Sequence, residues 1–228
     1  MSLPRIISVD DHVVEPPHVW QTYLPERFRE EGPRVERVKG VTGYNRRHFT
    51  FDESPDGVWG DRWVYDGITM PITEPYVSVC FDREPRVTTP VLLDEILPGC
   101  YDPSARVADM DANHVDASLC FPTFPRFCGQ TFLEAPDKEL AFACVQAYND
   151  WMIEEWCGGD ARGHLIPLAL LPLWDPLLAA AEVERCAAKG SHAVCFSESP
   201  PALGLRSIHD DVWAPLWRRP CCSALSGC

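Results

Sequence analysis

A carboxylate and an imidazole stand two residues apart near the amino terminus, at Asp10 and His12. The residues before them, 5–10 (RIISVD), are rich in β-branched side chains and predict a short buried strand. Side chains two residues apart on a strand point to the same side, so Asp10 and His12 could bind one divalent metal ion while Asp11 faces the other way. The alternative is an aspartate that caps the strand end beside a hydrogen-bonded histidine.

Helical and strand patterns alternate in the second half of the chain. Asp102, Asp137 and Asp175 each precede a helical pattern as a cap. Apolar segments near residues 117–121, 164–171 and 192–196 predict strands, in addition to the first strand. Strands of this kind between helices indicate a parallel sheet, which is either doubly wound or a barrel. No glycine-rich nucleotide-binding motif follows a strand, which favours the barrel.

The number of strands sets the expected extent of the barrel. A closed (β/α)8 barrel needs eight strands in about 250 residues, and this sequence predicts four. We therefore expect an α/β fold of the TIM type in which residues 1–217 form about the first four βα units. Residues 16–98 are interpreted as an insertion over the barrel mouth, with a hairpin formed by residues 47–51 and 58–65.

The last residues, 218–228, have no periodicity and follow a helical pattern at residues 211–217 that Pro220 cuts short. They are interpreted as an aberrant tail. The hypothesis is a C-terminal truncation by a frameshift or premature stop in a longer gene.

Composition and charge restrict the function classes. With 46% hydrophobic and 24% charged residues, the chain has the composition of a folded globular protein. A formal net charge of -14 and a sequence pI near 4.8 argue against binding to nucleic acid or to an anionic membrane. No secretory signal is visible, and the longest apolar stretch, 165–174, is about half of what a membrane-spanning helix needs. A cytoplasmic location is expected.

The chain has 11 cysteines, scattered without the spacing of a structural zinc site or a redox pair. We expect them to be buried free thiols, because the small apolar sulfhydryl packs well in a core. A cysteine-rich redox protein would need paired thiols, which the spacing does not offer. Cys221, Cys222 and Cys228 crowd the last eight residues.

Several motifs together resemble the amidohydrolase-2 family, the relatives of aminocarboxymuconate-semialdehyde decarboxylase and γ-resorcylate decarboxylase. The resemblance reaches to about Trp217. It rests on residues 9–17 (VDDHVVEPP) with Trp20, 109–116 (DMDANHVD), 121–125 (FPTFP), 165–168 (LIPL) and 172–176 (PLWDP).

This resemblance implies that Asp10 and His12 are the first two ligands of a divalent metal ion, zinc or manganese. The family completes its site with two histidines and an aspartate from later strands, so no catalytic residue is identified here and the chain is expected to be inactive. The implied enzyme is a metal-dependent hydrolase or non-oxidative decarboxylase that acts on a small carboxylic acid. The alternative is a non-catalytic binding or assembly module, and a homo-oligomer is conceivable.

Further candidates are residues that follow strands, where barrel enzymes build their sites. Glu15 is expected as an outer-shell partner of the metal or as a substrate contact. Substrate contact is also predicted for Phe124, Arg126, Trp174, Ser197 and Glu198, each with loop packing or a solvated charge as the alternative.

The other histidines are weaker candidates. His164 and His192 lie at the amino ends of predicted strands, which is the wrong end for catalysis. His114 occupies a turn where the family usually has glycine.

Overall fold

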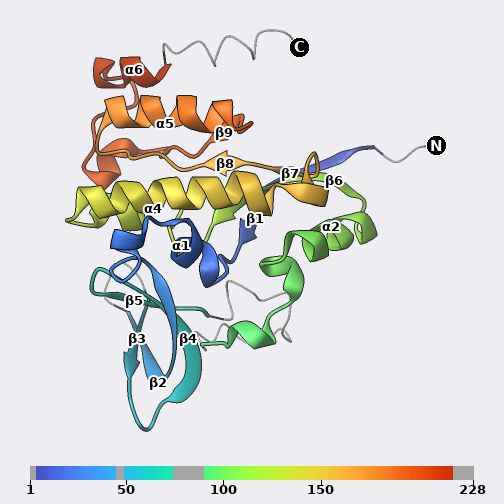
Figure 1. Ribbon diagram of the computed structural model, residues 1–228, viewed down its shortest axis with the longest axis vertical. Coiled ribbons are helices and arrows are strands. Elements are labelled where there is room, and N and C mark those ends of the chain that lie inside the picture. Colours follow the sequence, from blue (N-terminus) through green and yellow to red (C-terminus); the bar gives the residue numbers. More distant parts are fainter. Residues whose placement is uncertain (1–3, 45–48, 74–89, 218–228) are drawn as a thin grey trace.

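Parallel strands form the centre of the computed structural model, which describes residues 4–44, 49–73 and 90–217. Strand β1 (Ile6–Val13) pairs with β6 (Val115–Pro122), and β6 pairs with β7 (Leu165–Ile166). A second parallel pair joins β8 (Leu168–Ala169) to β9 (Ala193–Val194). Strands therefore lie at all four predicted positions (Figure 1).

Pro167 divides the third predicted strand into β7 and β8. Proline has no backbone N–H to donate to a sheet ladder, so a break in pairing at this residue is expected. Because β7 pairs with β6 and β8 pairs with β9, this one segment joins the two sheets. The parallel strands thus follow one another in the order of the sequence.

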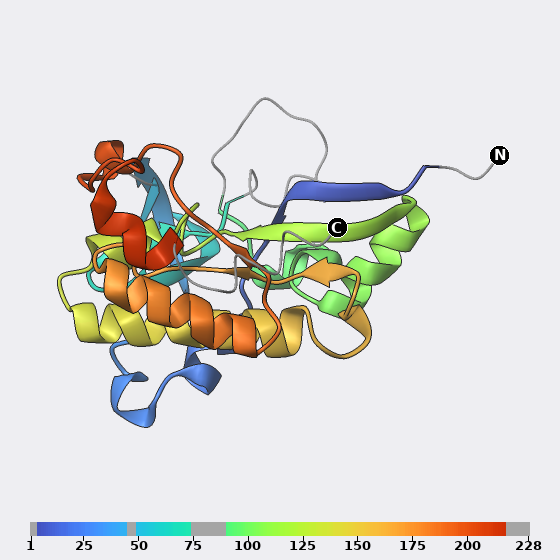
Figure 2. The same ribbon diagram turned by 90° about the horizontal axis from the view of Figure 1, so that it is seen from above.

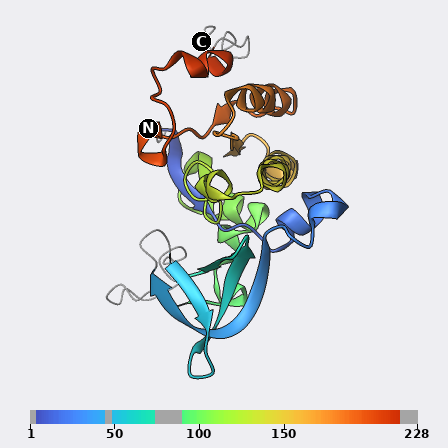
Figure 3. The same cartoon turned by 90° about the vertical axis from the view of Figure 1, so that its left-hand side faces the viewer.

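The three longest helices begin where the capping aspartates predict. They are α2 (Pro103–Ala112), α4 (Lys138–Trp151) and α5 (Pro176–Ala188), and the preceding aspartate accepts backbone N–H bonds in each. A π-helical turn, Met152–Trp156, extends α4. Figure 3 shows α4 and α5 together on one side of the parallel strands.

The remaining helical elements are short. They are α1 (His18–Tyr23), α3 (Gln130–Glu134), α6 (Ala214–Trp217), and 3-10 turns at Glu26–Phe28, Leu93–Glu95, Pro98–Cys100, Gly159–Ala161, Pro200–Leu203 and Asp211–Trp213.

A separate antiparallel sheet lies within residues 16–98, at the bottom of Figure 1. Its order is β3-β2-β4-β5, with β2 (Arg34–Tyr44), β3 (Phe49–Glu53), β4 (Val58–Tyr65) and β5 (Ile68–Pro71). The predicted hairpin between residues 47–51 and 58–65 is wrong, because β3 and β4 each pair with β2 instead of with each other. The partly exposed, charged β2 lacks the apolar pattern that would have revealed it.

An aromatic cluster packs the antiparallel sheet against the loop after β6. The Trp63 ring lies 5.1 Å from Trp20 and 4.9 Å from Phe124, measured between ring centroids. Tyr65 and Phe132 complete the cluster, and all five side chains are buried. The antiparallel sheet is thereby held at the carboxyl end of β6.

The helices cover one face of β6 more completely than the other. Ser118, Cys120 and Pro122 alternate as buried residues, while Leu119 and Phe121 on the opposite face are only half-buried. The neighbouring β1, which runs beside β6 in Figure 2, exposes Ile7 and Val9 by 56% and 63%. This second face is therefore open in the part of the chain that the structure describes.

Seven cysteines fall within the described residues, and all are free thiols. Six are buried and Cys100 is half-buried, which confirms the prediction for this part of the chain. Cys221, Cys222 and Cys228, together with the predicted aberrant tail at residues 218–228, lie outside the described residues. None of the described helices is long and apolar enough to cross a membrane.

Candidate active site at the carboxyl ends of the parallel strands

The end of β1 presents Asp10 and His12 to solvent. A register shift between Ser8 and Asp11 interrupts simple strand alternation just before Asp10. The Asp11 carboxylate turns to the helix-covered face, where it accepts hydrogen bonds from the hydroxyls of Ser8 (2.8 Å) and Ser118. His12 pairs in register with Phe121, so its side chain lies on the other, open face.

At this end of the described residues, Asp10 and His12 are the two predicted metal donors. A carboxylate and an imidazole are suitable ligands for zinc or manganese. Within the described ranges, however, no group of three or more His, Cys, Asp or Glu side chains is placed to hold a metal ion. Zinc sites use three or four protein ligands. The donor types of Asp10 and His12 fit a divalent ion, but their number does not complete a site.

Glu15 lies just beyond the end of β1 and has no exposed surface. Its carboxylate accepts hydrogen bonds from the backbone N–H groups of Thr123 (2.9 Å) and Phe124 (3.0 Å) in the loop after β6. Burial raises the Glu15 pKa to about 7, although the backbone hydrogen bonds lower it in part. The carboxylate therefore joins two strand ends.

The loop after β6 holds two of the predicted substrate contacts. Phe124 is fully buried in the aromatic cluster, as the packing alternative expects, and its contact with a substrate stays a prediction. Arg126 has a left-handed backbone, with φ of 63°, and its side chain forms an ion pair with Glu134 at 3.0 Å. The Arg126 guanidinium is thus already occupied by a neighbouring carboxylate.

The loops after the third and fourth strands hold the other predicted contacts. Trp174 is half-buried, with the Lys138 ammonium 4.9 Å from the ring centroid. Ser197 is buried and its hydroxyl accepts a bond from the Ser199 N–H, whereas Glu198 is exposed. No contact in the described residues joins these side chains to Asp10 or His12.

The loops after β6 and β9 do meet. The thiol of Cys195 donates to the Phe127 carbonyl at 2.7 Å. Burial raises the pKa of both the Cys128 and the Cys195 thiols, and the Glu198 carboxylate adds to the rise in each. The sequence does not predict the contact between Cys195 and Phe127, because neither Cys195 nor the neighbouring Cys128 belongs to a motif of regularly spaced residues.

The other histidines lie where the sequence places them. His164 and His192 directly precede β7 and β9, at the amino ends of these strands. His114 has φ of 58°, the left-handed conformation that glycine adopts most easily. The family's usual glycine at this turn therefore has a conformational reason.

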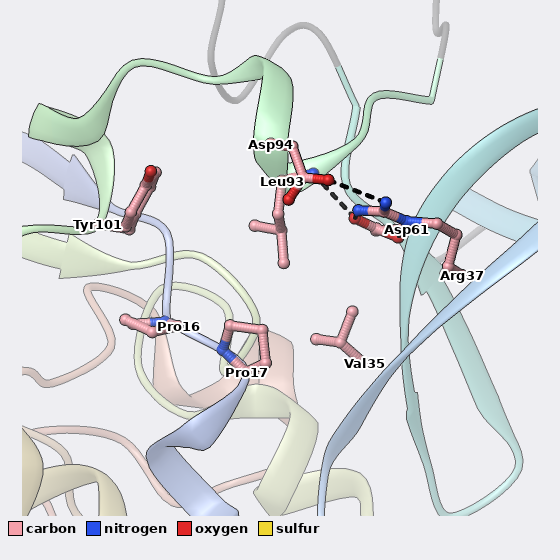
Figure 4. A pocket seen from close by; sticks show the side chains of 8 residues that line it. All are labelled: Pro16, Pro17, Val35, Arg37, Asp61, Leu93, Asp94 and Tyr101. Atoms are coloured by element: carbon pink, nitrogen blue, oxygen red, sulfur yellow. Dashed lines mark hydrogen bonds and ion pairs between the residues drawn. The ribbon is translucent and has the colours of Figure 1, made fainter.

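A pocket of about 410 Å³ lies between the segment after β1 and the antiparallel sheet. Figure 4 shows that Arg37 bridges Asp61 and Asp94 on one wall, while Pro16 and Tyr101 lie on the other side. Both oxygens of the buried Asp61 accept from Arg37, and these bonds raise the arginine pKa above its ordinary value. Sequence reasoning missed this bridge, since its three residues come from β2, β4 and the 3-10 turn Leu93–Glu95, which are brought together only by folding.

A buried polar network links α4, α5 and the third strand. The Asn149 side chain donates to the Leu170 carbonyl (3.0 Å) and accepts from the Leu170 N–H (2.8 Å). Asn149 also donates to Glu182, whose carboxylate binds Arg185 through two nitrogens. The sequence signal for this buried network was the presence of an asparagine and a glutamate on otherwise apolar helix faces.

Comparison with known proteins places the chain in a family. The amidohydrolase profile (the amidohydrolase-2 family) matches residues 89–225, which is more than half of the sequence. The chain belongs to the amidohydrolase family, and the predicted resemblance is confirmed at this level. The narrower relationship to decarboxylases has no support from the comparison. A search of curated proteins found no match.

Solved structures support the fold assignment. An amidohydrolase from Mycobacterium avium subsp. paratuberculosis K-10 is similar, with a TM-score of 0.60 and 24% sequence identity. The match covers 95% of this chain and 56% of the other, so the chain spans little more than half the length of that protein. The fold is of the TIM type with mixed α/β content.

Proposed function

We propose that this chain carries the first part of a metal-dependent amidohydrolase site, with Asp10 and His12 as two ligands of a zinc or manganese ion. The observation that carries the proposal is the position of this pair, which is exposed at the carboxyl end of the first parallel strand. Active sites of TIM-type enzymes are built at this end of the strands. A hydrolase-like enzyme is consistent with the amidohydrolase match.

The proposed substrate is a small carboxylic acid, and the reaction is either hydrolysis or non-oxidative decarboxylation. A divalent ion, when bound, supplies a binding point for a carboxylate or lowers the pKa of water. The chain's own contribution is to hold the two donors and to shape the surrounding loops. The described residues supply no third donor, so we propose that they do not support turnover by themselves.

We further propose that the four parallel strand positions correspond to the first four βα units of the barrel. In this interpretation, residues 16–98 form an insertion at the mouth. The packing of Trp63 and Tyr65 against Phe124 supports it, because Phe124 follows the carboxyl end of β6.

Zinc titration calorimetry tests the metal proposal. The free energy of zinc binding to a complete structural site is roughly 10–16 kcal/mol. If two of the four ligands supply about half of this free energy, the dissociation constant should lie between about 1 µM and about 0.2 mM. We expect one weak site in the wild-type chain and its loss in both Asp10→Ala and His12→Ala. Asp11→Asn is the matched control, because the Asp11 carboxylate faces Ser118 on the covered side.

Retention of the weak site in both Asp10→Ala and His12→Ala would contradict the proposal. A well-folded monomer that binds no zinc or manganese at millimolar concentration would instead favour the non-catalytic module.

A further inference from the structure

The loop after β6 connects Glu15 to His12 through a chain of direct contacts. We propose that Glu15 is a positioning residue: by holding residues 123–129, it fixes the aromatic pair Phe127 and Phe121, against which the His12 imidazole rests. This inference rests on the proposed function, in which His12 is a metal ligand. It assigns to Glu15 a task that involves no contact with metal or substrate.

The first step is the anchoring of the loop by Glu15. Each carboxylate oxygen accepts a different backbone N–H, from Thr123 at 2.9 Å and from Phe124 at 3.0 Å. Hydrogen bonds to an ionised acceptor are stronger than neutral ones, and Glu15 is fully shielded from water. The Thr123 hydroxyl adds a parallel connection by donating to the Val13 carbonyl at 2.8 Å.

The second step is the fixing of the rest of the loop. The Thr131 hydroxyl donates to the Phe124 carbonyl at 2.8 Å, and the Cys195 thiol donates to the Phe127 carbonyl. The backbone on both sides of Arg126 is therefore held, by β1 through Glu15 and by β9 through Cys195. Phe127 projects from this fixed segment.

The third step is the contact with His12. The rings of Phe127 and Phe121 stack with centroids 4.9 Å apart and planes 19° apart. The Phe121 ring also lies 6.1 Å from the His12 ring, measured between ring centroids, with the two planes tilted by 40°. Packed neighbours restrict a side chain to fewer rotamers, so the position of Phe127 limits the orientations of the imidazole.

Glutamine cannot replace Glu15 in this arrangement without loss. Its side chain has the same shape but offers one acceptor oxygen, and its NH2 group would face a second backbone N–H. Burial raises the Glu15 pKa to about 7, so the carboxylate is mostly ionised at a pH near 8. The comparison of glutamate with glutamine is therefore best made at that pH.

The test compares Glu15→Gln with Glu182→Gln. Glu182 is an equally buried and hydrogen-bonded glutamate, but it lies between α4 and α5. In Glu15→Gln we expect amide hydrogen exchange at Thr123 and Phe124 to become at least about tenfold faster. We also expect zinc binding to be about threefold to tenfold weaker than in wild type, because this loss of affinity corresponds to the free energy of one aromatic contact. Neither change is expected in Glu182→Gln.

A third variant, Phe127→Leu, tests the relay without touching Glu15. It should weaken zinc binding by a similar factor and shift the His12 ring resonances, while exchange at Thr123 stays as in wild type. Because Phe127→Leu leaves Glu15 intact, it also tests the inference if Glu15→Gln does not fold.

The inference is overturned if exchange at Thr123 and Phe124 is unchanged in Glu15→Gln, or rises equally in Glu182→Gln. It is also overturned if Phe127→Leu leaves the His12 resonances in place. If the wild-type chain binds no zinc, the proposed function fails. Amide hydrogen exchange at Thr123 and Phe124 and the His12 ring resonances then still decide whether Glu15 positions His12.

Discussion

The contribution of Glu15 to the free energy of unfolding should fall as pH rises, because its carboxyl group is buried. Burial raises its pKa from 4.5 to about 7 in the folded protein. The folded state therefore holds the proton more tightly than the unfolded state does. The stability from this group is fully present below about pH 4.5 and is lost as pH rises through about 7. At 1.36 kcal/mol for each pH unit, the total change is about 3 kcal/mol.

Urea unfolding of wild type and Glu15→Gln at about pH 5 and about pH 8 measures this change. Glutamine does not titrate, and the other ionisable groups contribute equally to both proteins. The free energy of unfolding of wild type minus that of the variant should therefore be about 2.5 kcal/mol lower at the higher pH. A difference that stays constant, or that rises with pH, would refute the assignment of this pKa to the buried carboxyl.

Three further substitutions test the packing around the site by urea unfolding. Phe124→Ala should destabilise the protein by about 3–5 kcal/mol, because it empties a fully buried aromatic position; a loss below about 1 kcal/mol would contradict a core role. Asn149→Ala should cost roughly 2–3 kcal/mol, because it leaves the N–H and carbonyl of Leu170 without their partner, and an unchanged midpoint would count against this. His114→Gly should stabilise by up to about 1 kcal/mol by relieving the left-handed backbone, whereas a loss would show that the imidazole contributes more than the strain costs.

The features that sequence predicts well here are local ones. Asp137 and Asp175 cap their helices because the capping bond joins residues two or three positions apart. The parallel strands are apolar on both faces, so their positions are visible in the composition of short segments. The left-handed turn at His114 is similarly local.

The features that sequence misses depend on distant partners. Strand β2 is recognised only by its pairing with β3 and β4, because its own residues are charged and partly exposed. Phe124 is buried by Trp63 of the antiparallel sheet, which no spacing around Phe124 could reveal. The role of Glu15 likewise depends on two N–H groups more than a hundred residues away.

Within the candidate site, the sequence singled out Asp10 and His12 from residue type and spacing. It could not foresee the register shift before Asp10, because that irregularity arises from pairing with β6. It also could not show that His12 rests on Phe121.

The pairing of Asp10 with His12 as metal ligands is the central claim, and paramagnetic broadening by manganese tests it most directly. Backbone and side-chain resonances are recorded while Mn²⁺ is added to the wild-type chain. Broadening should appear first at Asp10 and His12 and then at Phe121 and Phe127. Broadening centred elsewhere, or none at millimolar manganese, would contradict the claim.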